Sequence, residues 1–112
     1  MTMIYKILAA SIWQQAEASG TFLGAGIDLA DGYIHFSTAD QVRQTAALHF
    51  AGQNDLVLVA VDSDRLGSAL VFEPSRGGQL FPHLYGHLAV DIVAYIHPLA
   101  LGPDGVHQFP VL

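Results

Sequence analysis

The chain has 112 residues, of which 52% are hydrophobic and 12% are charged, and its formal net charge is −6. This length fits one domain over residues 1–112, and the small charged fraction predicts apolar surface that a ligand or a partner covers. The absence of cysteine excludes disulfide bonds and thiolate chemistry, and four scattered basic side chains (Lys6, Arg43, Arg65 and Arg76) cannot form a nucleic-acid surface.

The first predicted elements are a strand and a short helix. Residues 3–8 (MIYKIL) are apolar apart from one lysine, which predicts a strand. Ser11 offers an N-cap with Gln14 three residues later, and Gly20 offers a stop, so we expect a helix between them. This opening is too short for a signal peptide or a membrane span, which predicts a cytoplasmic protein without membrane contact. The glycine-rich residues 20–32 predict a loop.

A second strand and a second helix follow. Residues 33–37 (YIHFS) are rich in residue types that favour strands. Thr38 followed by Gln41 is a second helix start, and the apolar spacing predicts a helix from residue 39 to about residue 51, with Gly52 as the stop.

The second half is predicted to consist mainly of strands. Residues 56–61 (LVLVAV) are an unbroken apolar run, typical of a strand buried on both faces, and further strands are expected at residues 69–73 and 91–98. Alternating strands and helices followed by strands predict an α+β fold, with a small mixed or antiparallel sheet and two main helices. The glycine-rich turn of a dinucleotide-binding fold is absent, because residues 9–11 read AAS.

Polar side chains gather in two segments, of which the first is residues 31–38 (DGYIHFST). Tyr33, His35 and Ser37 alternate along the strand and therefore share one face, where they can bind a ligand by stacking and hydrogen bonding. Thr38, which follows Ser37, is a further ligand-binding candidate. The alternative is structural: His35 is a core histidine bonded to a carbonyl, and Ser37 and Thr38 cap the next helix.

The second segment is residues 73–86 (EPSRGGQLFPHLYG). Ser75, Gly77 and Gly78 form a flexible turn whose peptide N–H groups can approach an anion, beside the two-toothed guanidinium of Arg76. The alternative is an ordinary hairpin turn with a solvated arginine.

Acid–base and metal chemistry have few candidates in these segments. Imidazole titrates near neutral pH, so His35 and His83, together with Glu73, are the catalytic candidates. His83 and His87 have the i, i+4 spacing of helical metal ligands, but the neighbouring Pro82 and Gly86 oppose a helix, and we expect no metal site. No G-x-S-x-G motif of a serine hydrolase occurs.

The segments DGYIHFST, DLVLVAVD and EPSRGGQLFPHLYG closely resemble a small bacterial family, domain of unknown function 952 (DUF952), over nearly the whole chain. That family is in turn similar to a compact ADP-ribosyltransferase-like fold. The resemblance implies NAD as the cofactor, with His35-Phe36-Ser37 as the His-x-Ser element on its ribose and Tyr85 as an aromatic wall against nicotinamide. Two features depart from that fold. Its glutamate normally follows the aromatic residue, whereas Glu73 precedes Tyr85. Its several phosphate-binding arginines have only Arg76 as a possible counterpart here.

Two functions follow from this sequence. The first is binding of NAD or another nucleotide-like ligand, with or without ADP-ribosyl-transfer chemistry, with Arg76 at a phosphate, His35 at a ribose and Tyr85 as a stacking wall. The second is a non-catalytic module that binds a small molecule or a protein through the same pocket. Both require His35, Arg76, His83 and Tyr85 to converge on one cleft, although the two segments lie far apart in the sequence. No feature indicates an oligomeric state.

Overall fold

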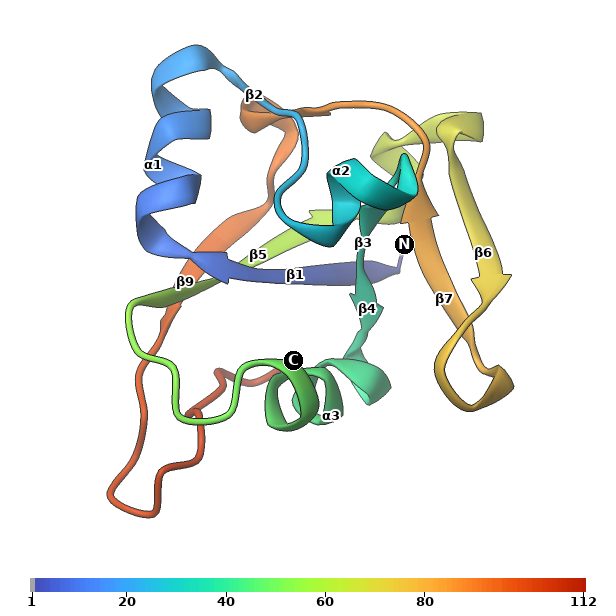
Figure 1. Cartoon of the computed structure of the whole chain (residues 1–112). Coiled ribbons are helices and arrows are strands. Elements are labelled where there is room, and N and C mark those ends of the chain that lie inside the picture. Colours follow the sequence, from blue (N-terminus) through green and yellow to red (C-terminus); the bar gives the residue numbers. More distant parts are fainter. Residues whose placement is uncertain (1) are drawn as a thin grey trace.

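The computed structural model describes residues 2–112, which form an α+β fold with antiparallel sheets (Figure 1). The main sheet has the strand order β4-β1-β5-β9, and a second sheet has the order β3-β7-β6. A third pairing joins β2 to β8. The strands are β1 (Met3–Ala9), β2 (Thr21–Phe22), β3 (Ile34–His35), β4 (Ser37–Thr38), β5 (Leu56–Asp62), β6 (Leu70–Pro74), β7 (Leu80–Leu84), β8 (Leu88–Ala89) and β9 (Tyr95–Leu99).

Three α-helices connect these strands within residues 2–112, and none of them is long and apolar enough to cross a bilayer. They are α1 (Ala10–Ser19), α2 (Ile27–Asp31) and α3 (Ala39–His49). Four 3₁₀ turns complete the chain: Ser63–Arg65, Gly67–Ala69, Arg76–Gly78 and Val90–Ile92.

The predicted N-cap of the first helix is wrong, although its end is right. Helix α1 follows β1 directly, with Ala9 in the N-cap position and Ser11 inside the first turn. A distant carbonyl replaces the capping side chain, because the Ala10 N–H donates to the oxygen of Asp55 at 2.7 Å. Gly20 ends the helix in the left-handed region at φ 88°, where glycine carries no steric penalty.

The glycine-rich residues 20–32, predicted to be a loop, contain β2 and α2. Phe22 is buried and pairs with Leu88, so a long-range contact orders this short strand. The five residues of α2 end at Gly32, again in the left-handed region.

The strand predicted at residues 33–37 is divided between two sheets. Phe36 is the dividing residue, and its N–H donates to the carbonyl of Pro82 at 2.9 Å. Before it, β3 pairs with β7, and after it, β4 pairs with β1 through Ile4 and Tyr5. The pairing between β4 and β1 ends at Tyr5, so on this side β4 does not pair with Lys6 or with the β1 residues that follow it.

The second helix is confirmed, with an earlier end than expected. Thr38 and Gln41 form a capping box, in which the Thr38 N–H donates to Oε1 of Gln41 at 3.1 Å. The helix stops at His49, because Phe50 leaves the helical region at φ −127°, and Gly52 lies in the turn beyond.

Two other strand predictions differ from the structure. The last strand begins at Tyr95 rather than at residue 91, because Val90–Ile92 forms a 3₁₀ turn. No strand was predicted around Pro82, but β7 runs through this proline as the middle strand of its sheet. Proline lacks a backbone N–H but keeps its carbonyl. Here the carbonyl of Pro82 accepts from the N–H of Phe36, so this hydrogen bond does not need the missing donor.

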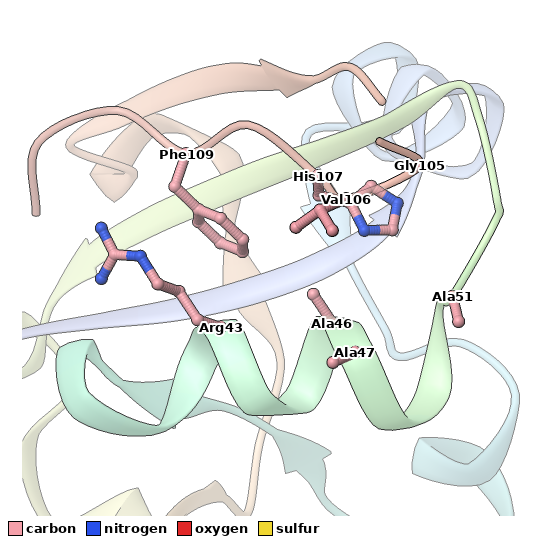
Figure 2. Close-up of a pocket in the computed structure, with 8 residues that line it drawn as sticks. All are labelled: Arg43, Ala46, Ala47, Ala51, Gly105, Val106, His107 and Phe109. Carbon is pink, nitrogen blue, oxygen red and sulfur yellow. The ribbon is translucent and has the colours of Figure 1, made fainter. Parts of the chain in front are cut away.

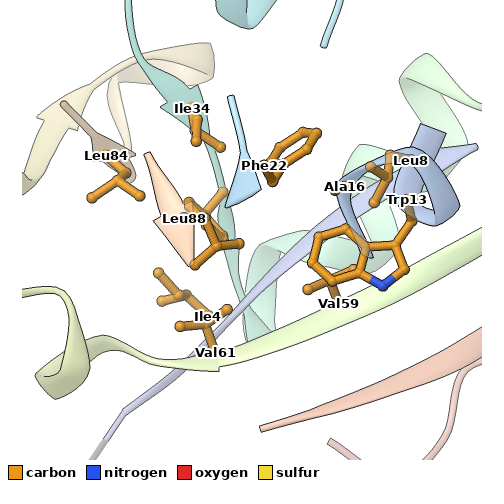
Figure 3. Close-up of a cluster of buried hydrophobic side chains, with 11 residues drawn as sticks. Ile4, Leu8, Trp13, Ala16, Phe22, Ile34, Val59, Val61, Leu84 and Leu88 are labelled. Carbon is orange, nitrogen blue, oxygen red and sulfur yellow. The ribbon is translucent and has the colours of Figure 1, made fainter. Parts of the chain in front are cut away.

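The core lies on both faces of the main sheet, because alternate residues of β1 and β5 point to opposite sides. Figure 3 shows one cluster, in which Ile4, Val59 and Val61 of the sheet meet Leu88 and the α1 residue Trp13. The other cluster packs the opposite side of β1 and β5 against α3. The predicted burial of residues 56–61 is confirmed by Leu58, Val59, Ala60 and Val61, which are all 0% exposed.

Candidate functional site

A cavity of about 690 Å³ opens beside the part of β1 that β4 leaves unpaired. In Figure 1, β1 runs between α2 and α3. The cavity is lined by residues of β1, α2, β3 and α3, and by the turn between β6 and β7. Its volume lies in the range of small-molecule sites. The cavity therefore lies at the break in the strand, where Phe36 itself is one of the lining residues.

Asp28 is the polar centre of one wall and is 3% exposed. The Lys6 ammonium lies 3.0 Å from its Oδ2 atom, and Nδ1 of His35 lies 2.6 Å from its Oδ1 atom. Backbone N–H groups of His35 and Ala25 donate to the same carboxylate at 3.1 and 3.0 Å. Burial by itself raises the pKa of the Asp28 carboxyl, but the Lys6 charge and these hydrogen bonds outweigh it, so that the pKa lies below its ordinary value.

Asp28 was not predicted as a site residue, although the sequence contains a signal for it. Lys6 is the one charged residue in the buried strand β1, and a buried ammonium requires a carboxylate partner. Burial lowers the pKa of Lys6, and the attraction of Asp28 offsets this in part. The sequence therefore indicates a carboxylate partner for Lys6, but it does not identify which of the ten acidic residues this is.

His35 lies between two carboxylates. Its Nε2 atom is 3.0 Å from Oδ2 of Asp31, while its Nδ1 atom bonds to Asp28. Ionised carboxylates only accept hydrogen bonds, so a doubly protonated ring satisfies both partners at once and a neutral ring satisfies one. The predicted carbonyl partner of the His35 ring is thus replaced by carboxylates.

The two polar segments meet in an aromatic cluster around Tyr33. The pairing of β3 with β7 sets His35 opposite His83, with ring centroids 5.4 Å apart. The Tyr33 ring stacks on His83 at 4.1 Å and lies 4.6 Å from His35 and 5.1 Å from Tyr85. Three of the four side chains expected to converge (His35, His83 and Tyr85) therefore lie together around Tyr33. They do not share one cleft as predicted, because Tyr33 and His35 line the cavity whereas His83 and Tyr85 do not.

Glu73 joins His83 and Tyr85 at the outer side of this cluster. Its Oε1 atom accepts from the Tyr85 hydroxyl at 2.7 Å and lies 2.8 Å from Nδ1 of His83. The bond from Tyr85, followed by that from His83, holds the pKa of Glu73 below its ordinary value. The same bond to Glu73 raises the pKa of Tyr85 to about 12.

Arg76, the fourth expected residue, lines the same cavity as His35. Its guanidinium carbon lies 4.8 Å from the centre of the Phe81 ring. Its Nη2 atom donates to Oγ1 of Thr45 at 3.3 Å and to Oε1 of Gln44 at 3.4 Å. Within residues 2–112 no carboxylate pairs with it. The guanidinium therefore contacts only uncharged side chains among the described residues, and its positive charge is not neutralised by an ion pair.

The glycines beside Arg76 form a tight turn rather than an open cradle for an anion. Gly77 and Gly78 have φ values of 67° and 76°, which favour glycine. The Gly78 N–H donates to the carbonyl of Ser75 at 2.9 Å, so this donor is used within the turn. Ser75 lines the cavity.

Ser37 and Thr38 have separate positions. The Ser37 hydroxyl is 2.8 Å from that of Thr45, and both residues line the cavity. Thr38 caps α3, as the structural alternative predicted. Across residues 2–112, no group of three or more His, Cys, Asp or Glu side chains is arranged to hold a metal ion.

Comparison with known proteins identifies relatives along nearly the whole chain. Residues 7–96 match DUF952, a protein family of unknown function. The X-ray structure of protein CC0527 from Caulobacter crescentus is 50% identical in sequence, with a TM-score of 0.91, and the match covers 96% of this chain and 94% of that one. The solution NMR structure of CC0527 gives 51% identity, a TM-score of 0.87, and coverage of 96% and 93%.

Neither the family description nor the names of these structures state an activity. A search of curated proteins found no match. The resemblance to DUF952 is confirmed, whereas none of these matches confirms an ADP-ribosyltransferase-like fold, which stays a prediction.

Proposed function

The chain belongs to the DUF952 family, and from its site we propose that it binds a small, anionic, nucleotide-like ligand in the cavity beside β1. The observation that carries this proposal is the uncompensated charge of Arg76 at that cavity. The chain has ten acidic and four basic side chains, so an arginine without a carboxylate partner is conspicuous. A guanidinium binds phosphate in a two-toothed arrangement, and an anionic ligand would supply the missing charge.

Asp31 and His35 support a sugar as the second part of the ligand. The Asp31 side chain is 38% exposed and has lone pairs beyond the one that faces His35. Carboxylates accept hydrogen bonds from the hydroxyl groups of ribose. Asp28 fixes the His35 ring from behind, so the Asp31–His35 pair presents a preorganised polar edge to the cavity.

Binding is better supported than group transfer. Transfer to an acceptor needs a carboxylate at the reacting atoms, and Glu73 was the candidate. Its Oε1 atom already serves both His83 and Tyr85, and Glu73 is not among the residues that line the cavity. We therefore infer that the protein binds ligands such as NAD or ADP-ribose, which combine phosphate with ribose. Catalysis of ADP-ribosyl transfer is the less supported function.

A protein-binding role is the alternative, and one observation favours it. Leu23, Ile27 and Leu29 are 57%, 64% and 66% exposed around α2, and Ile27 also lines the cavity. Exposed apolar side chains at the rim of a cleft are typical of an interaction surface. A partner that binds there would contact α2 rather than Arg76.

Calorimetric titration of the full chain with ADP-ribose, NAD and nicotinamide tests the proposal. We expect ADP-ribose and NAD to bind, and Arg76→Gln to weaken both on the order of tenfold or more, because a charge-assisted hydrogen bond is lost. Nicotinamide, which has no phosphate, should be insensitive to this change. Arg65→Gln is the matched control, because Arg65 is exposed and lies outside the cavity lining. Equal ADP-ribose affinity for Arg76→Gln and the parent would contradict the proposal.

A further inference from the structure

A second cavity, of about 370 Å³, lies on the other side of α3 (Figure 2). It is an open hollow bordered by α3, Ala51 and residues 105–109, and it shares no lining residue with the cavity beside β1. Ala46, Ala47 and Ala51 form its floor, and their short side chains leave the hollow that Val106 and Phe109 cover from the opposite side.

The segment that covers this cavity is fixed in place by hydrogen bonds. The Gly102 N–H donates to the carbonyl of Val106 at 2.8 Å, and His107 forms a β-bridge with Leu101. The Nε2 atom of His107 lies 2.8 Å from the carbonyl of Gln53. The cavity is therefore formed before any ligand binds, which lowers the entropic cost of binding.

Arg43 supplies a positive charge at the edge of this apolar space. Its guanidinium carbon lies 5.4 Å from the centre of the Phe109 ring, and no carboxylate within residues 2–112 pairs with it. Of the four basic side chains, Lys6 is neutralised by Asp28, whereas Arg43 and Arg76 each line a cavity without an ionic partner. Each of the two cavities is therefore lined by one arginine that has no carboxylate partner among the described residues.

His107 adds a second polar group, which is 7% exposed. A carbonyl only accepts hydrogen bonds, so Nε2 of His107 must carry the hydrogen that it donates to Gln53. This hydrogen bond joins the segment that covers the cavity to the chain just after α3.

We propose that this second cavity binds a small monocarboxylate with an apolar body, of the class of medium-chain fatty acids. The carboxylate pairs with the Arg43 guanidinium, and the hydrocarbon chain packs against Ala46, Ala47 and Phe109. A single cation beside a mainly apolar lining suits one negative group and a hydrocarbon chain, rather than a polyanion.

Titration of the full chain with octanoate, followed by calorimetry, tests this assignment. We expect octanoate to bind and octylamine, which has the same chain with the opposite charge, not to bind. Arg43→Gln should weaken octanoate binding on the order of tenfold, because the charged partner is removed. Arg65→Gln and Arg76→Gln should leave it unchanged. Ala47→Leu should also weaken it, because Ala47 is exposed, so that the larger side chain fills the hollow without disturbing the core.

Three results would overturn the proposal. Octanoate that does not bind the parent at millimolar concentration removes the ligand class. Equal affinity of Arg43→Gln and the parent removes the ionic contact. Loss of binding in Arg76→Gln, with Arg43→Gln unaffected, would mean that octanoate occupies the cavity beside β1 instead. None of these results contradicts ADP-ribose binding in the cavity beside β1, so the two proposals fail independently.

Discussion

Replacing Asp28 by asparagine should destabilise the fold strongly, because it removes one member of the buried Lys6–Asp28 ion pair. The carboxylate is buried and holds Lys6, His35 and two backbone N–H groups. Removing one member of a buried ion pair leaves the other charge uncompensated and costs about 3–5 kcal/mol. This is a large part of the roughly 5–15 kcal/mol that stabilises a domain. Asp91→Asn is the matched control, because Asp91 is exposed.

The pH dependence of this effect has a definite sign. The folded-state pKa of Asp28 lies below its ordinary value, so the group contributes stability at pH values above its unfolded pKa, about 3.9. That contribution is lost as the pH falls through the folded-state pKa. The difference in unfolding free energy between the parent and Asp28→Asn should therefore be full above about pH 4 and should shrink on further acidification.

Urea unfolding at several pH values measures both quantities, with the midpoint and slope fitted for each variant. A loss of less than about 1 kcal/mol for Asp28→Asn at neutral pH would refute the reasoning, because an exposed site behaves in that way. A difference that stays constant on acidification would show that ionised Asp28 is not the stabilising species.

Two further predictions concern the phenol of Tyr85 and the core. Tyr85 should titrate near pH 12, measured as the phenolate absorbance lost in Tyr85→Phe, and Glu73→Gln should move it toward the ordinary value of about 10. The stability from this bond is present below about pH 10 and lost as the pH rises through about 12; an unchanged titration in Glu73→Gln would exclude the bond. Leu58→Ala should cost about 2–5 kcal/mol in urea unfolding, because Leu58 is 0% exposed and leaves a cavity, whereas a loss below about 1 kcal/mol would place it outside the core.

The parts of the fold that local sequence determines were predictable. The apolar run of β5 and the Thr38–Gln41 capping box each depend on neighbouring residues, and both are confirmed. The start of α1 was not predictable in this way, because a carbonyl of Asp55, far along the chain, takes the place of the capping side chain of Ser11.

The candidate site depends on contacts that no local pattern contains. The break at Phe36 arises from its hydrogen bond to Pro82, which also places that proline within a strand. The grouping of His35 with His83 follows from strand pairing across the two polar segments. The residue types of the site were visible in the sequence, but Asp28 was missed because glycine-rich surroundings suggested a loop.

Chemical-shift mapping of ADP-ribose on the isotopically labelled chain tests the central claim most directly. We predict saturable shifts at Tyr33, His35 and Arg76, which line the cavity beside β1, and no shifts at Arg43 or Phe109, which line the second cavity. Shifts confined to the exposed apolar residues around α2 (Leu23, Ile27 and Leu29) or to the second cavity, or an absence of shifts at millimolar ADP-ribose, would contradict the claim that this cavity binds a nucleotide-like anion.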